Sequence, residues 1–171
     1  MENINVVLVD ENDNEIGLEE KLKAHQNGAK LHRAVSVLLF NSKGQLLMQR
    51  RALSKYHSQG KWANTCCSHP FPGEDNLAAA QRRLKEEMGV ECRLKEAFHY
   101  TYKAEVGNGL TEHEYDHIFF GEFDGMPKPN KDEVMDWKWM SLKDLRADMS
   151  RNPQNYAPWL SFTDEVINRR N

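Results

Sequence analysis

The strongest local signal in the sequence is one amphipathic helix that lies between two groups of strand-like segments. Apolar residues recur there at helical spacing, namely Leu77, Ala80, Leu84 and Met88. Asp75 can accept hydrogen bonds at the start of this helix, and Gly89 can end it in a left-handed conformation. A helix with a single apolar face needs other elements to pack against, so this segment predicts a layered fold.

The segments around this helix have the alternation and the β-branched composition of strands. Those before it are 4–9, 33–40 and 45–49, and those after it are 98–105, 115–123 and 134–140. Residues 41–44 (NSKG) form a short polar loop, which predicts a hairpin of its two flanking segments. Helical spacing returns at 142–149 and 159–168. The expected class is α+β with a mostly antiparallel sheet.

Length and charge limit the possible functions. The 171 residues suit a single domain spanning 1–171, and a net charge of −3 disfavours a nucleic-acid partner. The longest apolar runs are too short to cross a membrane, and the N-terminus lacks a secretory signal pattern, so a cytoplasmic location is expected. Three cysteines are an odd number, which argues against a disulfide framework and leaves room for a reactive thiol.

Three histidines and a pair of glutamates can provide metal ligands. The histidines are His25, His32 and His69, and strand alternation would place Glu112 and Glu114 on one face. Each imidazole alone also suits the surface or a hydrogen-bonded core position, and the two carboxylates alone suit a solvated face. Together they form a mixed nitrogen and oxygen set, which favours Mn²⁺, Zn²⁺ or Fe²⁺ over Mg²⁺.

The segment NTCCSHP at 64–70 places two thiols beside an imidazole. A free cysteine is usually a small buried hydrophobe, but in an exposed polar loop near a cation its pKa falls and its sulfur becomes reactive. Cys66 and Cys67 cannot both point inward from an extended segment. The spacing of a CxxC zinc site is absent from the sequence, so a structural metal clip is disfavoured.

Basic residues from three separate segments can form a phosphate clamp. They are Lys21, Arg50, Arg51, Lys55, Arg82 and Arg83. If the hairpin packs against the long helix, Arg51, Lys55 and Arg83 converge, with arginine providing forked contacts and lysine a point charge. The alternative is scattered surface charge.

Residues 68–90 (SHPFPGEDNLAAAQRRLKEEMGV) resemble the Nudix box, G-x5-E-x7-R-E-U-x-E-E-x-G-U with U apolar. The matching positions are Glu74, Arg82, Leu84, Glu86, Glu87, Gly89 and Val90. Ser68 replaces the first glycine, and Arg83 replaces a glutamate that helps to carry the hydrolytic metal. A cation at that position weakens a Mg²⁺ site for diphosphate hydrolysis and adds a ligand for the phosphate itself.

This altered box, the segment NTCCSHP, the spacing of His25 and His32, and the later EHE together resemble type 1 isopentenyl-diphosphate isomerases. The resemblance covers nearly the whole chain and includes EEKLKAH, LFNSKGQLLMQRRALSK and KDEVMDWKWM. It implies a Nudix-like fold with a central mixed or antiparallel sheet flanked by helices. It also implies interconversion of isopentenyl and dimethylallyl diphosphate by protonation and deprotonation.

The resemblance further implies roles for individual residues. The catalytic residues would be Cys67, Glu114 and Tyr102, and the substrate-binding residues would be Lys21, Arg51, Lys55, Arg83 and Trp159. His25, His32, His69, Glu112 and Glu114 would hold Mn²⁺ or Zn²⁺, while Glu87 would meet a Mg²⁺ that travels with the diphosphate. The expected partner is a small isoprenoid diphosphate, without nucleic acid or membrane, and the expected state is a monomer or weak dimer. A Nudix-type diphosphate hydrolase and a catalytically silent metal-binding domain remain the alternatives.

Overall fold

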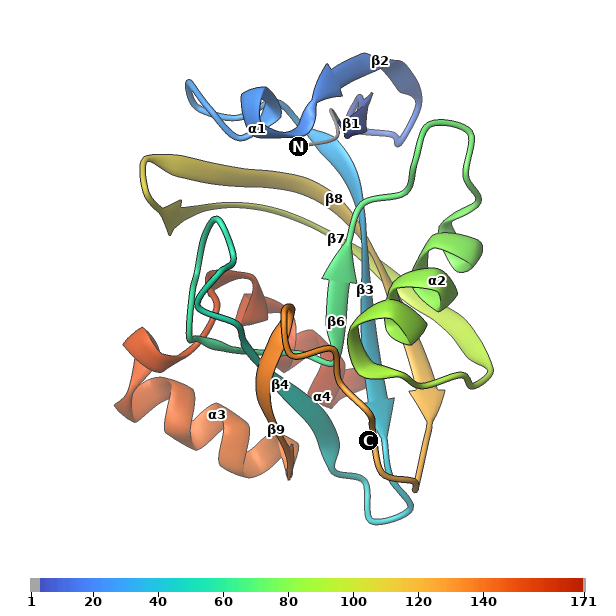
Figure 1. Ribbon diagram of the computed structural model, residues 1–171, viewed down its shortest axis with the longest axis vertical. Helices are drawn as coiled ribbons and strands as arrows, with labels where there is room; N and C mark the ends of the chain where they lie inside the picture. Colours follow the sequence, from blue (N-terminus) through green and yellow to red (C-terminus); the bar gives the residue numbers. More distant parts are fainter. Residues whose placement is uncertain (1–3, 171) are drawn as a thin grey trace.

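The computed structural model describes residues 4–170, which form a curled mixed sheet with helices on both sides (Figure 1). The strands are β1 (Asn5–Val9), β2 (Glu15–Glu20), β3 (His32–Phe40), β4 (Leu46–Arg51), β5 (Trp62–Ala63), β6 (Cys66–Ser68), β7 (Leu94–Gly107), β8 (Leu110–Glu122) and β9 (Val134–Met140). The helices are α1 (Lys21–Ala24), α2 (Asn76–Met88), α3 (Leu142–Arg151) and α4 (Thr163–Arg170), with 3-10 turns η1 (Pro153–Asn155) and η2 (Pro158–Phe162). Within residues 4–170, no helix has the length and apolarity needed to cross a membrane.

Strand β3 is the centre of the sheet. It pairs in parallel with β8 from His32↔Glu114 to Phe40↔Glu122, and antiparallel with β1, β4 and β6. The long β7–β8 hairpin extends the sheet beyond β8, and β9 pairs antiparallel with β4. The pairings between named strands other than β3–β8 are antiparallel, so the predicted mixed, mostly antiparallel α+β fold is confirmed for the described residues.

Side-chain alternation along β3 separates two apolar layers. Val35, Val37 and Leu39 pack in one core with the buried face of α2. Leu38 and Phe40 point to the other side and pack with residues of α3, η2 and α4. Figure 1 shows α2 on one side of the sheet and α3 and α4 on the other. A strand that is buried on both faces is apolar at successive positions, which explains the continuous run VSVLLF.

Helix α2 begins and ends where its sequence predicts. Asp75 accepts a hydrogen bond from the backbone N–H of Ala78 at 3.1 Å, and Gly89 ends the helix at a φ of 63°. A Cβ at Gly89 would also lie 2.5 Å from the carbonyl oxygen of Lys128, so only glycine fits there. The prediction that Leu77 belongs to the buried apolar face is wrong, because Leu77 is exposed. The buried face instead comprises Ala79, Ala80, Leu84, Glu87 and Met88.

The predicted hairpin is present, but its strands share only the pair Phe40↔Leu46 before they diverge. Residues 64–65 fill the gap between them. The Thr65 hydroxyl accepts a hydrogen bond from the N–H of Leu39 at 3.0 Å and donates one to the carbonyl of Leu47 at 2.7 Å. One side chain thus bridges the two strands, whose backbone groups at this level lie too far apart to pair directly.

Two other segments differ from the expected structure. The thiol segment is not an exposed loop, because Cys66–Ser68 pairs with β3 as the short strand β6. Trp159 lies in the 3-10 turn η2 rather than in the final α-helix, which begins at Thr163. Pro158 at the start of η2 fixes the backbone there, so the helical spacing of 159–168 is divided between two elements.

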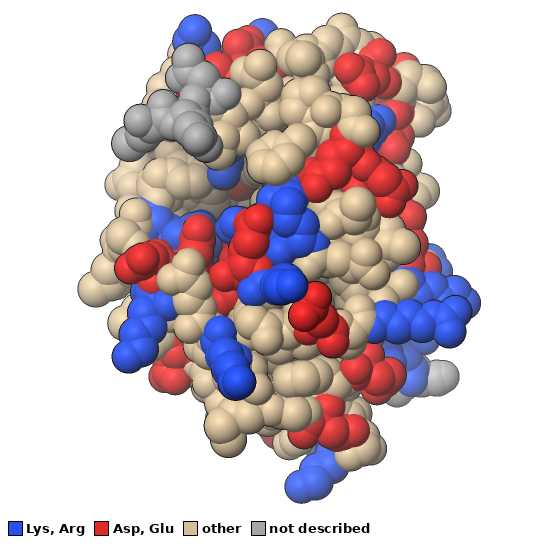
Figure 2. Space-filling model, turned by 45° about the vertical axis from the view of Figure 1, so that its right-hand side comes forward, with Lys and Arg blue, Asp and Glu red and all other residues tan. Residues whose placement is uncertain are grey.

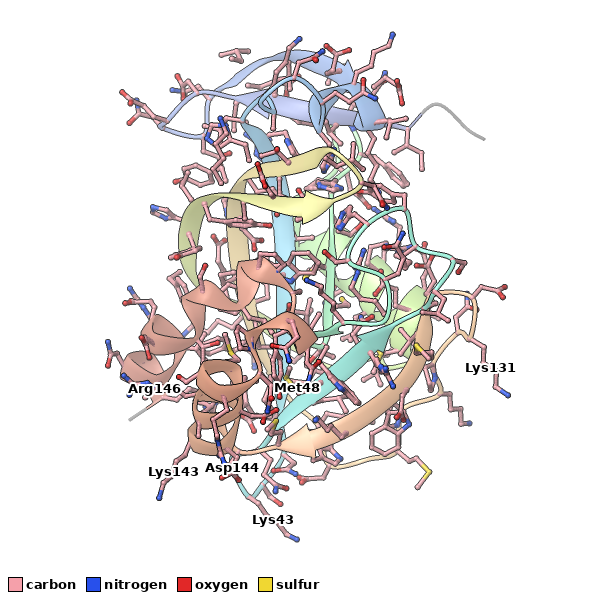
Figure 3. All side chains as sticks on the ribbon, turned by 90° about the vertical axis from the view of Figure 1, so that its left-hand side faces the viewer. Lys43, Met48, Lys131, Lys143, Asp144 and Arg146 are labelled. Atoms are coloured by element: carbon pink, nitrogen blue, oxygen red, sulfur yellow. The ribbon has the colours of Figure 1, made fainter. Side chains whose placement is uncertain are left out.

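In the lower half of the molecule, buried apolar side chains point inward and exposed charged side chains point outward. In Figure 3 Met48 of β4 lies inside the molecule, and Lys43, Lys131, Lys143 and Arg146 point away from it. Met48 is fully buried among residues of β3, η2 and α4.

We expect Thr65→Val to lower the free energy of unfolding by roughly 1–3 kcal/mol, because a valine of similar shape leaves two buried backbone groups without their partner. Urea denaturation followed by circular dichroism measures the change. Thr101→Val on exposed strand β7 is the matched control, and its effect should stay within about 0.5 kcal/mol. Equal stability of the two variants would contradict the bridging role of Thr65.

Candidate active site

Three histidines and two glutamates meet in the interior of the molecule, near the start of β3. His32 begins β3, Glu112 and Glu114 project from one face of β8, His25 follows α1, and His69 follows β6. One ligand atom from each of the five lies within 4.8 Å of all the others, and all five residues are buried. The structure therefore brings the predicted ligand set together. The parallel β3–β8 register is the cause, since it places His32 directly opposite Glu114.

The ring orientations leave nitrogen atoms free to face the centre of this cluster. The Nδ1 atoms of His25 and His32 lie 2.6 and 2.8 Å from the main-chain carbonyls of Lys21 and Lys30. Those carbonyls accept a hydrogen from Nδ1, so the inward-facing Nε2 atoms, which contact Glu112 here, are the ones that could bind a cation in place of a hydrogen. The Nε2 atoms of His32 and His69 face each other at 3.2 Å. Two facing imidazole nitrogens beside buried carboxylates are the donor set of a divalent-cation site.

The acidic pair is electrostatically unfavourable without a cation. Burial, together with the neighbouring charge of Glu112, raises the pKa of Glu114 well above its usual value. Burial alone would also raise the pKa of Glu112, but hydrogen bonds from His25, His32 and His57 outweigh it and lower that pKa. The five residues thus fit a divalent metal.

Cys67 lies against polar groups and lines a pocket. Its Sγ is 3.0 Å from Asn64 Oδ1 and 3.4 Å from Ser36 Oγ, and Ser36 donates to Asp116 at 2.6 Å. Burial raises the pKa of the Cys67 thiol, so the expectation of a lowered pKa is wrong. Burial likewise raises the pKa of Asp116, to about 8. Cys66 points to the opposite face of β6 into the α2 core, as the geometry of an extended segment requires.

Tyr102 stands opposite Glu114 on the β7–β8 ladder, and its hydroxyl donates to Glu114 Oε2 at 2.6 Å. Burial and the adjacent carboxylates raise the pKa of Tyr102 well above its usual value, so it stays a neutral donor. Tyr102, Glu114 and Cys67 line the same pocket. Two groups able to exchange protons therefore face one enclosed space.

Four cations are among the residues that line this pocket. The lining residues are Lys21, Arg51, Lys55, Tyr56, His57, Cys67, Ser68, His69, Arg83, Tyr102, Glu112, Glu114 and Trp159. Burial lowers the pKa of Lys21 to about 8, and nearby Lys55 adds to this effect, so an anion bound here would relieve the repulsion. Figure 2 shows basic and acidic side chains next to one another across the middle of one face. The predicted convergence of Arg51, Lys55 and Arg83 is therefore observed.

Two of the basic candidates have other partners. Arg50 donates to the carbonyl of Gly60 at 2.9 Å. Arg82 makes a forked pair with Glu74 at 2.7 and 2.8 Å, which links helix α2 to the loop that precedes it. Both side chains have structural partners and neither lines the pocket.

Glu87 is buried behind Arg83. Its two oxygens are 2.5 Å from an Arg83 nitrogen and 2.8 Å from Gln49 Nε2. Glu133 also contacts this group, since it pairs with Lys55 and lies 3.6 Å from Arg83. Two of the clamp cations, Lys55 and Arg83, are thus held in place by carboxylates.

Sequence reasoning missed several residues of this site. His57 is 3 % exposed and its Nε2 lies 2.9 Å from Glu112 Oε1, where it orients a candidate metal ligand. Glu133 lies in the segment KDEVMDWKWM, and the resemblance of that segment to the isomerase family could have indicated it. Ser36 and Asp116 carry no spacing pattern, because only strand pairing brings them behind Cys67. Asn64 begins the segment NTCCSHP, but nothing in that segment indicates its contact with the thiol.

Comparisons with known proteins agree with this arrangement. A model of the NUDIX domain matches residues 30–160. The isopentenyl-diphosphate Delta-isomerase 2 of Aromatoleum aromaticum is 54% identical over 166 residues, covering 96% of this chain and 87% of the relative. The isopentenyl-diphosphate Delta-isomerase of Pectobacterium atrosepticum is 50% identical over 158 residues, covering 92% and 88%.

Solved structures show the same fold at lower identity. The protein DR0079 of Deinococcus radiodurans superimposes with a TM-score of 0.77 at 20% identity, covering 96% of this chain and 98% of that one. The fold and the extended identity to curated relatives lead to one assignment. This chain belongs to the isopentenyl-diphosphate Delta-isomerase family, within the NUDIX-domain proteins.

Proposed function

We propose that this chain interconverts isopentenyl diphosphate and dimethylallyl diphosphate by moving a proton onto one carbon and removing one from another. The observation that carries the proposal is a single pocket in which the Cys67 thiol and the Glu114–Tyr102 pair share one space with four cations. The family of the chain supports the same reaction.

The chemistry requires two proton-transfer groups and a dry cavity. Protonation of the unactivated double bond produces a tertiary cation, and loss of a proton from the neighbouring carbon completes the shift. Cys67 and Glu114 are the groups of suitable type, and each serves as acid in one direction and base in the other. Tyr102 holds Glu114 in place through its 2.6 Å hydrogen bond.

Trp159 is the proposed stabiliser of the cation. Its ring already attracts the Arg51 guanidinium, whose central carbon lies 5.1 Å from the ring centroid. An aromatic face attracts positive charge without offering a nucleophile that would trap the intermediate. The diphosphate would bind Lys21, Arg51, Lys55 and Arg83, which point its hydrocarbon end toward Cys67.

The buried His/Glu cluster suits a divalent ion held by His25, His32, His69, Glu112 and Glu114, for which we propose Mn²⁺ or Zn²⁺. When bound, such an ion supplies positive charge that orients Glu114 and biases its protonation. We further propose that Glu87 meets a Mg²⁺ that enters with the diphosphate. Arg83 would then exchange its bond to Glu87 for bonds to phosphate oxygens.

Hydrolysis of a diphosphate is not favoured. Arg83 replaces a carboxylate of the Nudix box and pairs with Glu87, so the box has lost part of its Mg²⁺ site. The decisive experiment follows deuterium from D₂O into isopentenyl diphosphate and measures released phosphate in the same sample. Deuterium on carbon without phosphate release is the expected result, and phosphate release alone would overturn the proposal.

Cys67→Ala should reduce isomerisation by about 100-fold or more, because it removes one proton-transfer group. Cys66→Ala, which is the matched control on the opposite face of β6, should retain most of the rate. A coupled assay of dimethylallyl diphosphate formation compares them. Equal losses in the two variants would rule out the assignment of Cys67.

Lys55→Ala and Arg83→Ala should raise KM roughly 10- to 100-fold with smaller changes in kcat, because phosphate contacts exist in both the ground and transition states. Glu114→Gln should chiefly lower kcat. Lys103→Ala on exposed β7 is the control and should change neither parameter. Steady-state kinetics with the opposite pattern would contradict these roles.

Purified protein should contain one tightly bound divalent ion per chain, and His25→Ala or His69→Ala should lower its affinity by about 10-fold or more. His113→Ala is the matched control, since His113 lies between the two glutamates but faces the other side of β8. Glu87→Gln should keep this ion and weaken diphosphate binding at limiting Mg²⁺.

Elemental analysis and titration calorimetry distinguish these outcomes. Full isomerisation by folded, metal-free protein in excess chelator would show that the cluster is not required for the reaction.

A further inference from the structure

We propose that Asn64 is a positioning residue that holds the Cys67 thiol and the Trp159 indole in a fixed relation through one oxygen atom. The inference rests on the proposed isomerase function and extends it to a residue that does not touch the pocket. Asn64 is fully buried immediately before Thr65, and it does not line the cavity that Cys67 and Trp159 share.

The orientation of the Asn64 amide is determined by the main chain. Its Nδ2 donates to the carbonyl of Val37 at 3.1 Å and to the carbonyl of Cys66 at 3.0 Å. Both amide hydrogens are therefore used on atoms that can only accept. A flipped amide would place its oxygen against two carbonyl oxygens, so Oδ1 must face the other way.

On that other side, Oδ1 meets two donors. The Cys67 thiol lies 3.0 Å from it, and the Trp159 Nε1–H donates to it at 3.0 Å. An amide oxygen has two lone pairs and can accept both hydrogen bonds at once. The indole N–H is a donor only, and as a buried group it needs this partner. One atom thus sets the position of the sulfur relative to the ring.

The second neighbour of the sulfur leaves this arrangement intact. Ser36 has one hydroxyl hydrogen, and its 2.6 Å bond to Asp116 uses it. Its contact with the sulfur, in which Ser36 Oγ can only be the donor, is longer at 3.4 Å and competes for that same hydrogen. Asn64 provides the shorter contact and is the group that couples the thiol to the indole.

Such coupling matters for the proposed reaction, because the proton donor and the aromatic face must meet the same five-carbon chain. A displacement of about 1 Å between reacting groups can reduce a rate about 100-fold. Asn64 contacts neither substrate nor metal ligand side chain, so its effect should appear in kcat with little change in KM.

The test compares Asn64→Leu, which removes the acceptor, with Asn64→Asp, which keeps an acceptor oxygen and loses the amide donors. Thr65→Val is the matched control, because it disturbs the same buried segment without touching Cys67 or Trp159. For each variant the experiment measures the unfolding midpoint, kcat and KM. It also records the indole N–H resonance of Trp159, assigned by comparison with Trp159→Phe.

We expect kcat of Asn64→Leu to fall about 10-fold or more below that of Thr65→Val at comparable stability, with KM changed less than about 3-fold. Asn64→Asp should recover part of that loss. The Trp159 resonance should move upfield in Asn64→Leu and stay in the hydrogen-bonded range in Asn64→Asp and Thr65→Val. Equal kcat for Asn64→Leu and Thr65→Val, or an unmoved indole resonance, would overturn the inference.

If Asn64→Leu does not fold, Trp159→Phe replaces it in a double-mutant cycle. Asn64→Asp should then change kcat by a smaller factor in the Trp159→Phe background than in the wild type, and equal factors would refute the coupling. A wild-type protein that incorporates no deuterium into isopentenyl diphosphate would refute the proposed function instead. The indole resonance still tests the Asn64 contact in that case.

Discussion

The site depends on how the gap between the diverging strands β3 and β4 is closed. Asn64 and Thr65 lie in that gap. Two strands that separate after one residue pair leave backbone groups inside the protein without partners. The Thr65 hydroxyl accepts a hydrogen bond from Leu39 and donates one to Leu47 across the gap, and the Asn64 side-chain amide donates to the carbonyl of Val37. The chain that makes these bonds continues directly into β6, whose Cys67 lines the pocket. Stability and chemistry are therefore served by consecutive residues of one segment.

The site contains buried groups of like charge that a bound ion of opposite charge would stabilise. Glu112 and Glu114 are buried side by side, and burial lowers the pKa of Lys21 to about 8. Before substrate binds, the guanidinium of Arg83 is shared between Glu86, Glu87 and Glu133. On the proposed assignment, phosphate oxygens would take the place of these carboxylates at the cation, and binding would exchange one set of ion pairs for another. Most of the water around these cations is then removed when the chain folds, and binding adds less to the free energy of desolvation.

Sequence patterns predicted the parts of the structure that depend on neighbouring residues. The cap at Asp75, the stop at Gly89 and the common face of Glu112 and Glu114 follow from local periodicity, and all are present. The parallel β3–β8 register joins residues 82 positions apart, as in His32↔Glu114, and no local pattern contains it. The thiol environment was misjudged for the same reason, because the burial that raises the pKa of Cys67 comes from distant strands. The residues alone offered the three histidines and two glutamates as a ligand set beside surface and core alternatives, and the resemblance to a family favoured the metal site.

The substitution at Arg83 shows how a hydrolytic box can serve another chemistry. Alternation along β3 sends Val35, Val37 and Leu39 toward α2, while His32 and Ser36 lie at positions of opposite parity. His32, Ser36, Glu114 and Asp116 therefore come from β3 and β8, and the other candidate ligands of the His/Glu cluster also lie outside the box helix. With the box carboxylate replaced by Arg83, α2 contributes a cation to the pocket, and Glu87 behind it holds that cation in place. On the proposed function, such a box would bind the diphosphate without completing a hydrolytic metal site, and the reacting carbons would extend toward Cys67 and Glu114.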